Sequence, residues 1–229
     1  MPPPAVPKPR KNAPRISAVV FDMDGVMVDS ELQWKLAEKE FLLHRVPRWR
    51  AEDYQRVTGL SPSALYDFLN EAYGLAESRE SFLHDCGRLA ETIYKNRVTL
   101  ADGLLETFAR VKSSGRSLGI ASSSPRDWIS MVLERFGLAA WFGAVVSADD
   151  VNGRTKPLPD SYLAACARLG FVPEVCAAVE DSRVGVLAAK NAGLFCLAFR
   201  NGANGDQDFS AADAEIMSVK DVPEALRID

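Results

Sequence analysis

The stretch ISAVVFDMDG, residues 16–25, joins a short apolar run to two acidic residues. Residues 16–21 are rich in β-branched side chains, as expected of a strand that is buried on both faces of a parallel sheet. Asp22 and Asp24 follow at once, and their spacing of two lets both carboxylates face the same way near a strand end. Gly25 then allows the chain to turn sharply. The stretch therefore predicts a buried strand that ends in paired carboxylates.

The rest of the chain alternates between similar apolar runs and helical patterns. One helix is expected to have Ser124 as its N-cap and Pro125 at its first position, and to end at Gly137. Such alternation is typical of α/β proteins, so we predict a Rossmann-like, doubly wound parallel sheet. The further strands are expected at residues 117–121, 144–147, 176–179 and 195–199.

One long segment interrupts this alternation. Residues 30–98 resemble several helices with no convincing strand, which predicts an inserted α-helical domain. Residues 1–14 contain six prolines and no apolar periodicity, which favours a flexible, extended tail. We therefore expect a catalytic core made of residues 15–29 and 99–229, with the helical domain inserted after the first strand.

Composition excludes several classes of protein. With 229 residues, 47% of them hydrophobic, the chain can form a sizeable core, and a net charge of −4 gives no basic field for nucleic acid. No apolar run reaches the roughly 20 residues that a membrane helix needs, and the start lacks the apolar region of a secretory signal. The four cysteines form no C-x-x-C pair, so we expect free thiols in a reducing, cytoplasmic setting.

Ligands of open parallel sheets bind beyond the carboxyl ends of the strands. In this chain four predicted strands are each followed by polar or charged side chains. Taken singly, these are explained by a turn, a helix cap, a solvated lysine, or acidic residues that favour a helix N-terminus. Their occurrence in order, each after its own strand, favours one shared site. The candidate residues are Asp22, Asp24, Ser122, Ser123, Ser124, Lys156, Glu180 and Asp181.

These residue types suit phosphoryl transfer. Asp22 is the candidate nucleophile, because a carboxylate can form an aspartyl-phosphate. Asp24 is placed to protonate the leaving oxygen and later to activate water. Lys156 would add positive charge beside an anionic substrate, and Ser122 would donate a hydrogen bond to a phosphoryl oxygen.

The acidic residues also point to a metal ion. Two carboxylates as close as those of Asp22 and Asp24 repel each other unless a cation or a proton is shared. Glu180 and Asp181, from a neighbouring strand end, would complete an oxygen-rich site of the kind that Mg²⁺ prefers. We therefore expect Mg²⁺ as the cofactor.

At this point the sequence resembles the haloacid dehalogenase superfamily of phosphotransferases. The matching pieces are FDMDGVMVDS, IASSS, the lysine of TKPLPD, and VEDSRVGVLAA, which span most of the chain outside the tail and the helical insert. The resemblance implies that Asp22 is the nucleophile and Asp24 the acid/base, and that the helical insert is a cap that selects the substrate. It implies phosphate binding by Ser122, Ser123 and Lys156, and metal binding by Asp22, Asp24 (through its backbone carbonyl), Glu180 and Asp181.

Within this superfamily, the sequence most resembles the subgroup of beta-phosphoglucomutases and hexose-phosphate phosphatases. Asp24 argues against dehalogenases and phosphonate-cleaving relatives, which lack an aspartate there. Mutase-like members carry an arginine in a cap loop, whereas the matching loop here, Thr58-Gly59-Leu60-Ser61-Pro62, has no basic residue. Arg56 lies close by in sequence and keeps the mutase alternative open. Gly59 and Arg126 are the candidate substrate-binding residues.

The sequence therefore predicts a monomeric, Mg²⁺-dependent phosphatase that hydrolyses a small phosphorylated metabolite, with a sugar phosphate as the leading candidate. The runner-up is a beta-phosphoglucomutase-like sugar phosphomutase. A third hypothesis is a non-catalytic regulatory module that keeps the fold. No nucleic-acid or membrane partner is expected.

Overall fold

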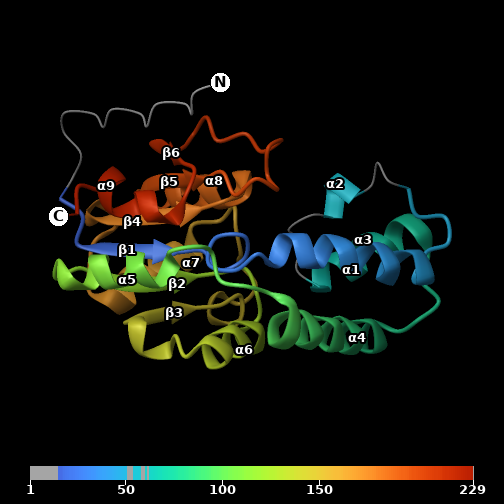
Figure 1. Cartoon of the computed structure of the whole chain (residues 1–229). Helices are drawn as coiled ribbons and strands as arrows, with labels where there is room; N and C mark the ends of the chain where they lie inside the picture. The colour runs from blue at the N-terminus through green and yellow to red at the C-terminus, as the bar shows by residue number, and fades with distance from the viewer. Residues whose placement is uncertain (1–14, 51–53, 58–59, 61, 229) are drawn as a thin grey trace, which may run out of the picture. The chain divides into compact units, whose positions relative to one another are not determined.

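The computed structural model describes residues 15–50, 54–57, 60 and 62–228. The chain divides into two compact units. One is formed by Met1–Asp29 and Thr99–Asp229, and the other by Ser30–Val98. The first unit contains the sheet, whereas the elements labelled in the second are all helices (Figure 1).

The first unit is built on a six-stranded sheet in which all neighbouring strands are parallel. The strand order, β3-β2-β1-β4-β5-β6, places β1 in the middle and confirms the predicted Rossmann-like α/β core. Phe21, at the end of β1, pairs with Ile120 on one side and Val179 on the other. Only the short edge strand β6 was not expected. The strands are β1 (Ala18–Phe21), β2 (Ser117–Ala121), β3 (Ala144–Val146), β4 (Cys176–Glu180), β5 (Phe195–Phe199) and β6 (Ala214–Ile216).

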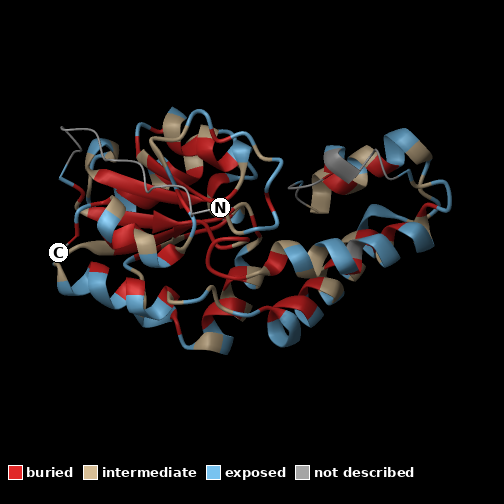
Figure 2. Ribbon diagram, turned by 45° about the horizontal axis from the view of Figure 1, so that its top comes forward, coloured by how far each residue is buried: buried red, intermediate tan, exposed pale blue. Residues whose placement is uncertain are grey.

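Helices cover both faces of this sheet. Ala18 and Val20 of β1 lie in one apolar cluster with buried residues of α7 and α8. Because successive strand residues face opposite sides, Phe21 points to the other face, where its ring packs against Phe108 of α5 with 5.2 Å between centroids. Figure 2 shows the strands buried between partly exposed helices. The helices are α5 (Leu104–Ser113), α6 (Arg126–Phe136), α7 (Asp160–Leu169), α8 (Arg183–Asn191) and α9 (Val222–Ala225), with 3-10 turns η3 (Ala139–Trp141), η4 (Asp149–Val151), η5 (Pro173–Val175) and η6 (Val219–Asp221).

The second unit has a small aromatic core of its own. Phe82 is fully buried, and its ring lies 5.6 Å from that of Phe41 and 5.5 Å from that of Tyr66. Trp49 and Tyr66 pack against this core, as expected of aromatic residues in a small helical unit. The elements are α1 (Ser30–Arg45), α2 (Tyr54–Val57), α3 (Pro62–Tyr73), α4 (Arg79–Thr92) and the π-helix η2 (Ile93–Arg97).

All four cysteines are buried, and none of them forms a disulfide bond. Among the described residues, no helix has both the length and the apolar character needed to cross a bilayer.

Phe108 should contribute strongly to the stability of the sheet unit, because it is fully buried against Phe21 and Phe142. We expect Phe108→Ala to lower the free energy of unfolding by about 3–5 kcal/mol, through lost burial and the cavity left behind. Leu105→Ala on the same helix is the matched control, since Leu105 is 45% exposed and its loss should cost less than about 1 kcal/mol. Urea denaturation checks both, and equal losses would contradict this packing.

Candidate functional site

The carboxyl ends of the central strands bring the predicted polar residues together. Asp22 follows β1 directly, and its backbone N–H still donates to the carbonyl of Val179 in β4 at 3.0 Å. Ser122 follows β2, and its N–H donates to the carbonyl of Val146 in β3 at 3.0 Å. Glu180 is the last residue of β4. The sheet ladder thus continues into the first residue of each loop and positions these side chains at one edge.

A buried ion triad forms the centre of this edge. The Nζ atom of Lys156 lies 2.5 Å from Oδ1 of Asp22 and 2.6 Å from Oε1 of Glu180. The Lys156 side chain is only 4% exposed and Glu180 is fully buried. Lys156 comes from the loop between η4 and α7, and the Lys156–Pro157 peptide bond is cis. One ammonium therefore bridges the segment that follows β1 and the last residue of β4.

Glu180 is held by further contacts that sequence reasoning missed. The hydroxyl of Tyr162, on α7, donates to Oε1 of Glu180 at 2.6 Å, and the Tyr162 ring lies 5.3 Å from Nζ of Lys156. Ser182 Oγ lies 3.4 Å from Oε2 of Glu180, and a methyl group on Gly185 would overlap that carboxylate. A buried tyrosine needs a hydrogen-bond partner for its hydroxyl. A tyrosine on the predicted apolar face of a helix, six residues after Lys156, could therefore have indicated a polar contact at this site.

Electrostatics couple these groups. Burial raises the pKa of Asp22; Lys156 opposes this effect, Glu180 and Asp24 add to it, and the net pKa lies well above its usual range. Burial by itself lowers the pKa of Lys156, but the carboxylates of Asp22 and Glu180 outweigh it and raise that pKa. The site thus contains more buried carboxylate groups than ammonium groups. A cation bound beside them would favour the ionised form of Asp22.

Asp24 lies on the tight turn that follows β1. Its Oδ2 atom accepts a hydrogen bond from Ser124 Oγ at 2.7 Å and a long one from Ser122 Oγ at 3.5 Å. Ser122 Oγ in turn accepts from the N–H of Ser124 at 3.0 Å. The prediction of Ser124 as a helix N-cap was wrong: α6 begins at Arg126 after Pro125, and the Ser124 hydroxyl turns to Asp24 instead.

Three carboxylates could hold a metal ion. Asp22, Glu180 and Asp181 each offer an oxygen atom within 4.8 Å of the others, and all three residues are buried. An all-oxygen donor set with surplus negative charge suits a hard divalent cation such as Mg²⁺. The Asp24 side chain is outside this group and faces the serines.

The loop after β5 supplies two residues that the sequence reasoning did not consider. Asn201 donates to the Asp181 side chain, and Asn204 donates to the Asp181 backbone carbonyl, both at 2.8 Å. The available signal was position: both asparagines follow the fifth predicted strand, at the same edge of the sheet as the other candidates.

The remaining candidates lie further from this centre or outside the described residues. Ser123 sits in the loop between β2 and α6 and is half-buried. Arg126 is exposed at the start of α6; its guanidinium pairs with Asp150, and its N–H donates to Asp149 Oδ2 at 2.8 Å. Gly59 lies outside the described residues.

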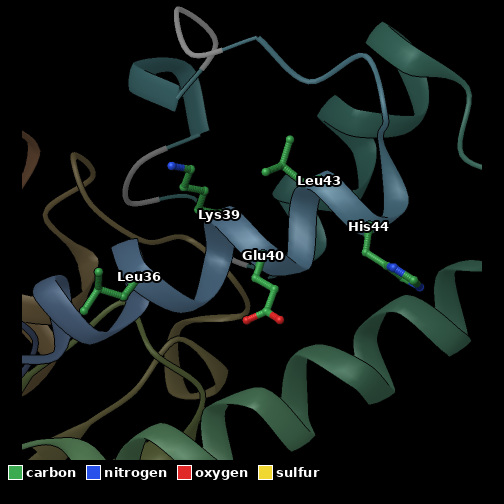
Figure 3. A pocket seen from close by; sticks show the side chains of 5 residues that line it. All are labelled: Leu36, Lys39, Glu40, Leu43 and His44. Atoms are coloured by element: carbon green, nitrogen blue, oxygen red, sulfur yellow. The ribbon is translucent and has the colours of Figure 1, made fainter.

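A separate hollow of about 460 Å³ lies along α1 in the helical unit. Leu36, Lys39, Glu40, Leu43 and His44 line it, and Figure 3 shows their side chains fanning out from one helix. Leu36 and Leu43 are 63% and 44% exposed. The hollow therefore contains neither the carboxylates nor the lysine of the sheet edge.

The chain is similar to known proteins over most of its length. A family model described as "Haloacid dehalogenase-like hydrolase" matches residues 19–199, which include every residue of the ion triad.

Two curated relatives align over nearly the whole chain. Protein CbbY of Rhodobacter capsulatus is 32% identical over 210 residues, covering 88% of this chain and 92% of the relative. Hexitol phosphatase B of Escherichia coli (strain K12) is 31% identical over 212 residues, covering 91% and 95%. Among solved structures, CbbY from Rhodobacter sphaeroides in complex with phosphate has a TM-score of 0.79 at 24% identity, covering 90% of this chain and 96% of that one. The last likeness establishes the fold.

Asp150 should make stability depend on pH. Burial opposes its ionisation, but hydrogen bonds from Ser147, Arg168 and Arg126 outweigh that effect and hold the pKa of its carboxyl well below the usual range. Its contribution is therefore present above the unfolded-state pKa of about 3.9 and is lost as pH falls towards the folded-state value.

We expect Asp150→Asn to lower the free energy of unfolding by about 1–3 kcal/mol at neutral pH. The difference from the wild type should narrow below about pH 4. Urea denaturation at several pH values measures the free energy of unfolding of both proteins. A difference between them that does not vary with pH would be inconsistent with a lowered pKa of Asp150.

Proposed function

The chain belongs to the haloacid dehalogenase-like hydrolase family, and on that premise we propose that it is a phosphatase that transfers the phosphoryl group of a sugar phosphate first to Asp22 and then to water. The observation that carries the proposal is the buried contact between Asp22 and Lys156 at the edge of the sheet. Hexitol phosphatase B, 31% identical, supports a phosphorylated sugar as the substrate class.

Asp22 acts as the nucleophile. One carboxylate oxygen attacks phosphorus, the bond from phosphorus to the ester oxygen breaks, and an aspartyl-phosphate forms. Lys156, which contacts Oδ1 of Asp22, compensates part of the charge that builds up on the phosphoryl oxygens. Glu180 and the Tyr162 hydroxyl keep the lysine in place.

Asp24 acts as the general acid and then as the general base. In the first step its proton passes to the leaving ester oxygen, so the sugar departs as an alcohol. In the second step Asp24 takes a proton from the water that attacks the aspartyl-phosphate, which releases inorganic phosphate and regenerates Asp22. The hydrogen bond from Ser124 holds Oδ2 of Asp24 in a fixed direction throughout.

Ser122, Ser123 and Lys156 are the proposed phosphate-binding residues, and Arg126 and Gly59 the proposed substrate contacts. We assign Asp22, Glu180 and Asp181, with the backbone carbonyl of Asp24, to a Mg²⁺ site. When bound, Mg²⁺ would reduce the repulsion between the carboxylate nucleophile and the anionic substrate. The absence of disulfide bonds among the four cysteines supports a reducing compartment such as the cytoplasm.

The alternative is a sugar phosphomutase. Arg56 is the basic residue nearest in sequence to the loop at 58–62, and its guanidinium lies over the Phe68 ring at 4.6 Å within the helical unit. A mutase would return the phosphoryl group to the sugar, so the products distinguish the two reactions.

The experiment is a phosphate-release screen over a panel of sugar phosphates and other small monoesters, with Mg²⁺. We expect one group of sugar phosphates to be hydrolysed. Asp22→Asn, which keeps the shape but removes the nucleophile, should lower kcat by at least about a thousandfold. Chelation of the metal should abolish turnover.

Phosphorus NMR on the same reactions checks the type of reaction. Release of one inorganic phosphate for each sugar phosphate consumed supports hydrolysis. Formation of an isomeric sugar phosphate without inorganic phosphate would show that the reaction is that of a mutase. Turnover that survives Asp22→Asn would refute Asp22 as the nucleophile.

The role of Asp24 gives a separate prediction. We expect Asp24→Asn to lower kcat by about 10²–10⁴-fold with the best sugar phosphate, whose alkoxide leaving group needs a proton. The loss should be much smaller for p-nitrophenyl phosphate in the phosphorylation step, because its leaving group departs without protonation. Pre-steady-state release of p-nitrophenolate measures this step, and an equal loss with both substrates would contradict the assignment of Asp24 as the acid.

A further inference from the structure

Asn201 connects two parts of the candidate site. It lies in the loop after β5, and its Nδ2 atom donates to Oδ2 of Asp181 at 2.8 Å and to the backbone oxygen of Gly25 at 2.9 Å. Its Oδ1 atom accepts from the N–H of Ala203 at 2.9 Å. Because this last contact requires an acceptor, the amide nitrogen must face Asp181 and Gly25, and both of its hydrogens are used.

The carboxylate that Asn201 contacts is also packed against the turn that carries Asp24. Gly25 has a φ of +76°, and a methyl group at this position would overlap the Asp181 carboxylate. The turn and the carboxylate are therefore in direct contact, and Asn201 fastens each of them with one hydrogen bond.

A second asparagine holds the backbone of the same residue. Asn204 is only 8% exposed, and its Nδ2 atom donates to the backbone oxygens of Asp181 and Phe199, both at 2.8 Å. The main chain and the side chain of Asp181 are thus positioned by two different residues of one loop.

The loop itself is well anchored. The guanidinium of Arg200 donates to the backbone oxygen of Gln207 at 2.8 Å, pairs with Glu215 at 2.8 Å, and lies over the Phe209 ring at 4.1 Å. Gln207 Oε1 accepts from the N–H of Arg183 at the start of α8 at 2.9 Å. A loop tied to β6 and α8 in this way can hold Asn201 in a defined position.

We propose that Asn201 is a positioning residue for the metal site, which orients the Asp181 carboxylate towards the oxygens of Asp22 and Glu180. This inference rests on the proposed function, because it takes the acidic group as the site of a divalent cation. Residues that orient metal ligands change metal affinity or activity by about 10–100-fold when they are removed.

The test uses the intact protein, freed of metal with a chelator and titrated with Mn²⁺, with the free ion measured by electron paramagnetic resonance. Asn201→Leu keeps the size of the side chain but removes both hydrogen bonds that Nδ2 donates, together with the Oδ1 acceptor. We expect it to raise the Kd for Mn²⁺ by about tenfold or more. Asn70→Leu, at an exposed position on α3, is the matched control and should leave the Kd unchanged.

Two further readouts separate positioning from loss of structure. The melting temperature of metal-free Asn201→Leu should fall by only about 2–4 °C for each kcal/mol that is lost with its hydrogen bonds, and the variant should still unfold cooperatively. Excess Mg²⁺ should restore most of its phosphatase activity, which it would not do for a misfolded protein. If Asn201→Leu does not fold, Asn201→Ala removes the same two donors and should raise the Kd by at least about tenfold.

Each negative result has its own meaning. A Kd for folded Asn201→Leu within twofold of the wild type, with Mn²⁺ bound normally by the wild type, overturns the role of Asn201 and leaves the proposed function intact. Wild-type protein that binds no Mn²⁺, or whose binding survives Asp181→Asn, overturns both the metal site and this inference.

Discussion

The contact of one buried ammonium with two buried carboxylates is the constraint on which the rest of the site depends. Lys156 can stay charged with its side chain 4% exposed only because Asp22 and Glu180 lie within 2.6 Å of it. That arrangement requires two loops and the end of a strand to meet at one edge of the sheet. Asp22 follows β1, Glu180 ends β4 and Lys156 lies in the segment after β3. The parallel pairing of β3, β2, β1 and β4 places all three at one edge, so the sheet topology and the ion triad are linked.

The excess of carboxylate groups around this triad underlies the proposed chemistry. Glu180 contacts Lys156 and Tyr162 through Oε1, and together with Asp22 and Asp181 it offers a carboxylate oxygen that could hold a cation. Asp24 is only two residues away but has different contacts, because its Oδ2 accepts hydrogen bonds from serine hydroxyls, whereas Oδ1 of Asp22 contacts the Lys156 ammonium. Two nearby carboxylates in unlike surroundings are suited to unlike tasks, one as nucleophile and the other as acid and base.

The sequence predicted those residues whose position follows from strand ends alone. Asp22, Ser122 and Glu180 each follow or close a buried apolar run, so the edge they share could be inferred without side-chain geometry. Tyr162 could not be found in this way, because its contact with Glu180 depends on the phase of a helix. Asn201 does follow a predicted strand, but its contact with Asp181 depends on the path of the loop, so its position alone did not single it out. Ser124 was misassigned for a related reason. A serine before a proline resembles a helix N-cap, and its hydrogen bond to Asp24, which lies far away in the sequence, cannot be inferred from the local pattern.

The central claim is that Asp22 carries the phosphoryl group during turnover. The most direct test is to mix the enzyme with Mg²⁺ and p-nitrophenyl phosphate, quench with acid within the first turnover, reduce with borohydride, and sequence the peptides by mass spectrometry. An aspartyl-phosphate is reduced by borohydride to homoserine, so the account predicts homoserine at position 22 and nowhere else. An unmodified Asp22 under conditions of active turnover, or a phosphoryl group trapped on another residue, would contradict it.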